Sequence, residues 1–306
     1  MTAGVSAVAA AAAAQDPGSP RRLSATAFTD RLYPLSAEIK IPGATIRYSE
    51  AGGGEAVLLC HGIPLSMTTW QDLFFLLAED HRVIAVDMPG YGRSSKGPGD
   101  YSLARIAGDM VELCSALNIS RMHVVGSSFG AAVAITIALG YPSRVNRLVL
   151  INSVGIAGGT HKVERIVRSA LVRHFAAGVL LQKRLGRSIF RSKLSASYAT
   201  LEPDPALVDH YYALLRRDHG ELSFLRTLEQ FDEAALQRRL QHLANPVLSI
   251  WGGKDRVLPL SKSLGVQRLL PNCWSTVIAE AGHLPHEEMP EACASRIRSF
   301  LAMPAL

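Results

Sequence analysis

The most informative segment of the chain reads Val124-Val125-Gly126-Ser127-Ser128-Phe129-Gly130-Ala131-Ala132. It has the form G-x-S-x-G, between an apolar strand pattern and a helix of small residues. A serine on such a strand-to-helix turn has strained backbone dihedrals and leaves its hydroxyl exposed above the sheet. Gly126 and Gly130 let the turn close, and the following helix directs free N–H groups toward the hydroxyl. Ser128 is therefore a candidate nucleophile, although the same spacing also occurs by chance in Gly- and Ser-rich loops.

Short apolar runs alternate with helical periodicity on both sides of this turn. A strand pair is predicted at 39–41 and 45–48, and buried parallel strands at 56–60, 83–86, 123–125 and 148–151. Helical patterns occupy 69–77, 102–117 and 128–139. This alternation predicts an α/β fold with a doubly wound, mostly parallel sheet.

The alternation stops after Asn152, and residues 153–232 are helical in pattern without a convincing strand. It resumes with strands at 247–251 and 275–278, a helix from about residue 260, and a last helix through Ile297. We therefore predict a core made of residues 36–152 and 233–303, with a helical cap inserted at 153–232.

Composition is that of an ordinary globular enzyme, with 48% hydrophobic and 19% charged residues. The cysteines are scattered, which indicates neither a zinc site nor a disulfide framework and favours a reducing compartment (Cys60, Cys114, Cys273, Cys293). Residues 1–30 form an Ala-rich tail with no Lys or Arg before Arg21, unlike a secretory signal. We expect a disordered tail and a cytoplasmic protein without membrane insertion, and export is the alternative.

The net charge of +6 is unevenly distributed. Residues 160–200 contain nine Lys and Arg against one acid, and residues 201–235 contain eight acids against three arginines. The two halves of one helical region could complement each other or face solvent. Alternatively, a basic amphipathic helix could touch anionic lipid or an acidic substrate. The basic segment lacks interleaved aromatic residues, so we expect no nucleic-acid partner.

A nucleophilic serine needs a base, an orienting acid and an oxyanion hole. The loop after strand 247–251 ends in Asp255, and the loop after strand 275–278 contains His283. In a parallel sheet, both loops lie at the carboxyl edge where Ser128 is expected. The oxyanion hole requires two backbone N–H groups, which we assign to Phe129 and to Ile63 in the turn after strand 56–60.

Five ordered motifs resemble those of the cap-bearing α/β-hydrolases. Besides the serine turn they are His61-Gly62-x-Pro64, Asp87-x-Pro89-Gly90-x-Gly92-x-Ser94, Trp251-Gly252-x-x-Asp255 and Gly282-His283-x-Pro285-x-x-Glu288-x-Pro290-Glu291. The resemblance covers about residues 36–303, apart from the cap. It implies an eight-stranded sheet and the order nucleophile, acid, base for Ser128, Asp255 and His283.

Several neighbouring residues are rivals for these roles. His286 is the one serious alternative base, while His61 is expected to brace the oxyanion turn. Some relatives carry the acid at the position of Asn152, but an amide cannot stabilise an imidazolium as a carboxylate does. Asp87 resembles a structural aspartate of the family, and Ser127 is expected to pack or to form a local hydrogen bond.

The mechanism that the resemblance implies is acyl transfer through a covalent intermediate, without a metal or an organic cofactor. Apolar residues are expected around the site, including Ile63, Phe129, Leu258 and Leu284, the last two as substrate-binding residues. The predicted substrate is a small apolar ester; the sequence leaves the oligomeric state open.

Other activities remain possible on the same residues. A meta-cleavage-type C–C hydrolase is one, although Ser127 and Ile63-Pro64-Leu65 depart from that group's pattern of Asn before the serine and Gly-Pro-Gly after His-Gly. A biosynthetic thioesterase, cyclase or lyase is another. A ligand-binding receptor on a hydrolase fold is the alternative outside enzymes.

Overall fold

The computed structural model describes residues 28–156, 178–179, 182–199, 202–262, 269–270 and 272–304. Most of the predicted N-terminal tail, residues 1–27, lies outside these ranges, as does the N-terminal half of the basic segment from residue 160. The boundaries predicted for the tail and the cap therefore stay predictions. Among the described helices, none is long and apolar enough to span a membrane.

One eight-stranded sheet forms the centre of the molecule, in the order β1-β2-β4-β3-β5-β6-β7-β8. β1 and β2 form an antiparallel hairpin, and β2 also runs antiparallel to β4. All other neighbours are parallel. The predicted α/β fold with a mostly parallel sheet is confirmed. The strands are β1 (Ser36–Ile41), β2 (Ala44–Ala51), β3 (Ala56–Cys60), β4 (Arg82–Asp87), β5 (Met122–Ser127), β6 (Val145–Ile151), β7 (Val247–Gly252) and β8 (Cys273–Ile278).

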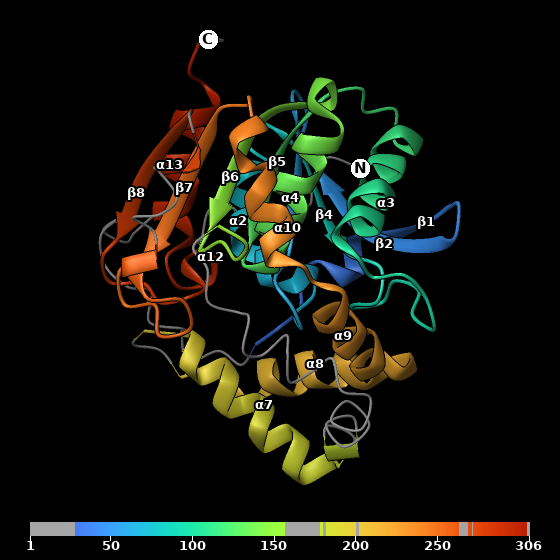
Figure 1. Ribbon diagram of the computed structural model, residues 1–306. Helices are drawn as coiled ribbons and strands as arrows, with labels where there is room; N and C mark the ends of the chain where they lie inside the picture. Colours follow the sequence, from blue (N-terminus) through green and yellow to red (C-terminus); the bar gives the residue numbers. More distant parts are fainter. Residues whose placement is uncertain are drawn as a thin grey trace.

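Helices cover both faces of this sheet (Figure 1). On one face lie α3 (Leu103–Ala116), α4 (Phe129–Gly140) and α10 (Glu233–Arg239). The other face is covered by α2 (Gln71–Leu77) and α13 (Pro290–Leu301), which contact each other. Short 3-10 helices occupy Tyr33–Leu35, Met67–Trp70, Pro142–Arg144, Arg217–His219, Leu240–His242 and Leu260–Lys262.

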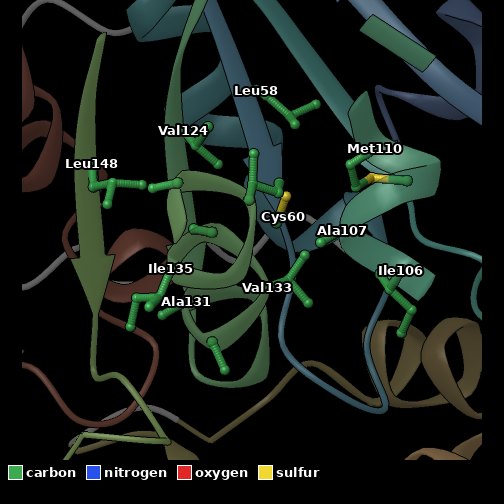
Figure 2. Packing of buried hydrophobic residues seen from close by; sticks show 14 of the residues in the cluster. Leu58, Cys60, Ile106, Ala107, Met110, Val124, Ala131, Val133, Ile135 and Leu148 are labelled. Atoms are coloured by element: carbon green, nitrogen blue, oxygen red, sulfur yellow. The ribbon is translucent and has the colours of Figure 1, made fainter. Parts of the chain in front are cut away.

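The central strands are buried on both faces, as their continuous apolar sequences predict. In β3, Leu58 and Cys60 belong to the cluster that contains α4, while Val57 and Leu59 belong to the cluster on the opposite face. Figure 2 shows the α4 side, where Leu58 and Val124 pack near the small residues of the helix. This packing fixes the position of α4, whose N-terminus meets the carboxyl end of β5.

Three further helices lie together beside one end of the sheet (Figure 1). They are α7 (Lys183–Ser197), α8 (Pro205–Arg216) and α9 (Gly220–Gln230). Their apolar residues form a separate cluster that includes Phe190, Leu194 and Tyr211. Leu65 and Leu284 from the core join this cluster. Leu65 follows the end of β3, and Leu284 follows the end of β8 and precedes α12 (Pro285–Glu288). The three helices, which we call the cap helices, therefore lie over the carboxyl edge of the sheet.

Candidate active site

The sheet has a topological switch point at β3. The chain continues from β3 to β4 on one side and returns to β5 on the other side. In open α/β sheets the crevice at the carboxyl ends of two such strands is the usual ligand site. Ile63 follows β3 and Ser128 follows β5, so the fold brings both predicted residues to this crevice.

Ser128 occupies a tight turn between β5 and α4. Its backbone has φ 53° and ψ −115°, a conformation that costs a non-glycine residue about 1–3 kcal/mol. Its amide donates to the Ile151 carbonyl at 2.9 Å. A Cβ on Gly126 would lie 2.2 Å from the Gly130 oxygen, and one on Gly130 would lie 2.0 Å from the Cys60 oxygen. The turn therefore requires glycine at both positions.

Two backbone amides are available at this corner. Phe129 is the first residue of α4, so its N–H has no partner within the helix. Among the described residues, neither the Phe129 nor the Ile63 amide donates a backbone hydrogen bond outside regular elements. A Cβ on Gly62 would approach the Ser128 Cβ to 3.2 Å, so the turn after β3 lies directly against the serine.

The carboxylate of Asp255 accepts four hydrogen bonds. One oxygen accepts the amides of Val257 and Leu258 at 2.7 and 2.8 Å. The other is 2.8 Å from Nδ1 of His283 and also accepts the side-chain amide of Asn152. The Asp255 side chain is fully buried, which strengthens its interaction with the ring. The arrangement orients His283 through Nδ1 and leaves Nε2 for a reacting group.

Asn152 braces this pair, a role that the sequence analysis did not assign. Its side-chain nitrogen donates to Asp255 and, at 3.2 Å, to the Gly282 carbonyl, and its oxygen accepts the Gly252 amide at 3.0 Å. Asn152 has a φ of 43°, which asparagine tolerates better than most residues. Asn152 therefore ties together the loop that carries Asp255 and the loop that carries His283.

The His283 loop is also attached to the cap. The His283 amide donates to the Ser197 carbonyl at the end of α7. Glu288 accepts the Gly282 amide with one oxygen and the Ala199 amide with the other, at 2.7 and 2.8 Å. The chain after α7 is therefore fixed to the loop that carries the candidate base.

A cavity of about 640 Å³ lies between this corner and the cap. Ser128, His283, Ile63 and Leu284 are among the residues that line it. No hydrogen bond joins Ser128 and His283 in the described contacts, and such bonds are often long before substrate binds. The cavity lining does not include Leu258, whose place is taken by Val257. Leu258 instead uses its backbone, donating to Asp255 and accepting from the Trp251 indole.

The Phe129 side chain is likewise absent from the cavity lining and packs edge-on against Phe231 at 5.7 Å. The role expected for Phe129 as an oxyanion donor therefore depends on its backbone amide, which directly follows Ser128. Ser127 is buried, and its hydroxyl has no hydrogen-bond partner among the described residues. Ser127 therefore packs in the core, one of the two outcomes expected for it.

The two rival histidines are held in other places. His286 is buried against Trp70 and within 2.9 Å of the Thr69 hydroxyl, and burial lowers its pKa to about 3. His61 contacts the Gly62 carbonyl through Nδ1 and accepts the Met88 amide through Nε2. Burial lowers the pKa of His61 to about 4. Both nitrogens of His61 are used in bracing the turn that carries Ile63.

Asp87 is a buried residue at the end of β4. It accepts hydrogen bonds from the Tyr33 hydroxyl and from the amides of Met67 and Arg93, at 2.6 to 2.8 Å. Burial raises its pKa to about 6. Asp87 does not line the cavity. Within the described ranges, no group of three or more His, Cys, Asp or Glu is arranged to hold a metal ion.

A polar cluster between cap and core was not foreseen from the sequence. The carboxylate of Glu287 accepts hydrogen bonds from Thr69 of the core and from Tyr198 and Tyr211 of the cap region. Burial raises the pKa of Glu287 to about 7. Tyr211 and Tyr212 are adjacent in the sequence, but nothing in the sequence indicates that Tyr211 donates to Glu287.

Comparison with known proteins gives one consistent result. The family model described as "alpha/beta hydrolase fold" matches residues 55–290. An uncharacterized protein of Mycobacterium tuberculosis is 30% identical over 267 residues, which are 82% of this chain and 76% of that protein. A 2-hydroxymuconate semialdehyde hydrolase of Pseudomonas putida is 30% identical, over 88% of this chain and 94% of that enzyme.

Among solved structures, an alpha/beta hydrolase fold protein from Burkholderia ambifaria has a TM-score of 0.77 at 24% identity. The match covers 89% of this chain and all of that one. At this identity the likeness concerns the fold alone.

Proposed function

Because the chain belongs to the α/β-hydrolase fold family, we propose that it is a serine hydrolase that cleaves a small apolar ester. The observation that carries this proposal is that Ser128 and His283 line one cavity, while the buried Asp255 lies 2.8 Å from Nδ1 of His283. A nucleophile, a base and an orienting acid are the groups that acyl transfer requires.

In the proposed mechanism, Nε2 of His283 takes the Ser128 proton while Oγ attacks the ester carbonyl. The amides of Ile63 and Phe129 stabilise the oxyanion, each lowering the barrier by about 3 kcal/mol. His283 then protonates the departing alcohol and activates a water that releases the acid. Asp255 keeps the proton on Nδ1 and stabilises the imidazolium.

The cavity supports an apolar substrate. Its lining includes Ile63, Leu65, Phe190, Leu194, Phe224 and Leu284. Apolar surface of this kind takes up an acyl chain or an apolar alcohol by the hydrophobic effect. A volume of about 640 Å³ is within the range of small-molecule sites.

Turnover of p-nitrophenyl acyl esters tests the proposal. Wild-type protein should release p-nitrophenol with a burst or steady turnover, and Ser128→Ala should be inactive on every chain length. Ser127→Ala is the matched control, because Ser127 is adjacent but buried without a hydrogen-bond partner among the described residues. An inactive wild type, or activity that survives in Ser128→Ala, would refute the proposal.

Hydrolysis of a C–C bond is the second candidate. A 2-hydroxymuconate semialdehyde hydrolase of P. putida aligns with this chain over 94% of its own length. The same residues would serve, with His283 moving protons for Ser128. Spectroscopic assay with 2-hydroxymuconate semialdehyde separates the two candidates. A kcat/KM on this compound far above that on any p-nitrophenyl ester would favour the second.

A further inference from the structure

The charged residues that line the cavity beside Ser128 are basic. Apart from His283, its charged lining residues are Lys193 and Arg256, and no Asp or Glu is among its lining residues in the described part of the chain. Most of the remaining lining is apolar. A cavity with two cations at an apolar wall is suited to a ligand that combines an apolar body with a negative charge.

Lys193 is contributed by the cap. It lies on α7, one turn before Ser197, whose carbonyl accepts the His283 amide. The Lys193 side chain is exposed and forms no ion pair with a described residue. Lys193 lines the cavity and is therefore available to a ligand there, on the helix whose end binds the loop of the candidate base.

Arg256 is contributed by the core. It directly follows Asp255, and its Nη2 donates to the Ala199 carbonyl at 2.6 Å. This bond holds the guanidinium at the junction of cap and core. Its other N–H groups have no hydrogen-bond partner among the described residues, so they are free to bind a ligand oxygen. A planar guanidinium binds a carboxylate through two parallel N–H groups.

We propose that the substrate of this site bears a carboxylate or a similar anionic group at the end of its apolar part, and that Lys193 and Arg256 bind it. The inference rests on the proposed function and names the substrate class of the same site. The two cations approach from different elements, the cap helix α7 and the loop after β7. They would also disfavour cationic esters, since no Asp or Glu of the described residues lines the cavity to offset them.

Two matched esters test the inference. One is the mono-p-nitrophenyl ester of suberic acid, and the other is the same ester with its distal carboxyl methylated. The wild-type protein should prefer the free carboxylate by about tenfold in kcat/KM. In Lys193→Met this ratio should fall about threefold, mainly through KM, because Arg256 still binds the carboxylate. High salt should lower the wild-type ratio by screening both cations.

Arg191→Met is the control for general charge. Arg191 is exposed on the same helix as Lys193 but does not line the cavity, so its loss should change the ratio less than twofold. A wild-type ratio near one would overturn the inference. So would a ratio that Lys193→Met leaves unchanged, or one that both variants lower equally.

Binding to Ser128→Ala, measured by calorimetry, separates this inference from the proposed function. Tighter binding of the free carboxylate, by about tenfold, supports the anionic substrate even if the wild type turns over neither ester. In that case the proposed ester hydrolysis fails and the charge recognition stands. Equal or absent binding of the two esters overturns the charge recognition, whatever the turnover.

Discussion

Replacing Asp255 by asparagine tests the orienting role of this residue. All the hydrogen-bond partners of its carboxylate are donors: the amides of Val257 and Leu258, the Asn152 side chain and Nδ1 of His283. The two backbone amides bind one oxygen, and Asn152 and His283 bind the other. An asparagine must direct its NH₂ at one of these two pairs of donors. The two backbone amides cannot turn away, so the NH₂ faces His283, which then keeps its proton on Nε2 instead of Nδ1.

A histidine with its proton on Nε2 cannot take the proton of Ser128. The loss of kcat for such a tautomer error in a serine protease is about 10⁴-fold, or roughly 5 kcal/mol of barrier. We expect a loss of that size for Asp255→Asn, measured on p-nitrophenyl esters with correction for the folded fraction. Burst titration shows whether the loss lies in acylation.

Asp87→Asn is the matched control, because Asp87 is also buried and accepts several hydrogen bonds, but none of them comes from His283. Its kcat should stay within a few-fold of wild type. If Asp255→Asn keeps kcat within tenfold of wild type, the assigned acid is wrong.

Three further predictions concern stability. Gly130→Ala places a Cβ 2.0 Å from the Cys60 oxygen and should lower the free energy of unfolding by about 3 kcal/mol; Gly140→Ala, whose Cβ would have no neighbour within 4 Å, should not. Burial lowers the pKa of His286 to about 3, so its neutral form stabilises the fold above pH 6.5 and this stability is lost as the pH falls. When the pH is lowered from 6.5 to 4.5, the free energy of unfolding measured in urea should fall by about 2–3 kcal/mol less in His286→Phe than in wild type. The pKa of Glu287 is raised by burial to about 7, so its pH dependence of stability is opposite to that of His286. The stabilising neutral form of Glu287 is lost as the pH rises from 4.5 through 7. From pH 4.5 to 8, the free energy of unfolding of Glu287→Gln should therefore rise by about 3 kcal/mol relative to that of wild type. If the difference between the two proteins does not change with pH, Glu287 does not titrate in this range.

The core of the fold could be predicted because local patterns determine it. Continuous apolar runs marked the central strands, and β3 has the same bounds in the sequence pattern and in the structure, residues 56–60. The contact between Asp255 and His283 also follows from the sheet, since β7 and β8 are parallel neighbours and their carboxyl ends are adjacent.

Features set by contacts distant in sequence were not predictable. Asn152 meets residues 100 or more positions away, so its bracing role had no local signal. Val257 lines the cavity in place of Leu258 because Asp255 accepts two successive amides and turns the loop. The placement of the cap depends on packing between helices, and periodicity gives only their buried faces.

Labelling with a fluorophosphonate probe, followed by peptide mass analysis, tests the central claim most directly. The probe reacts with a serine whose hydroxyl is activated by a base and whose adduct oxygen is held by an oxyanion hole. We predict one adduct, on Ser128, that disappears in His283→Ala as well as in Ser128→Ala. An unlabelled wild type, or an adduct on another residue, would contradict the account.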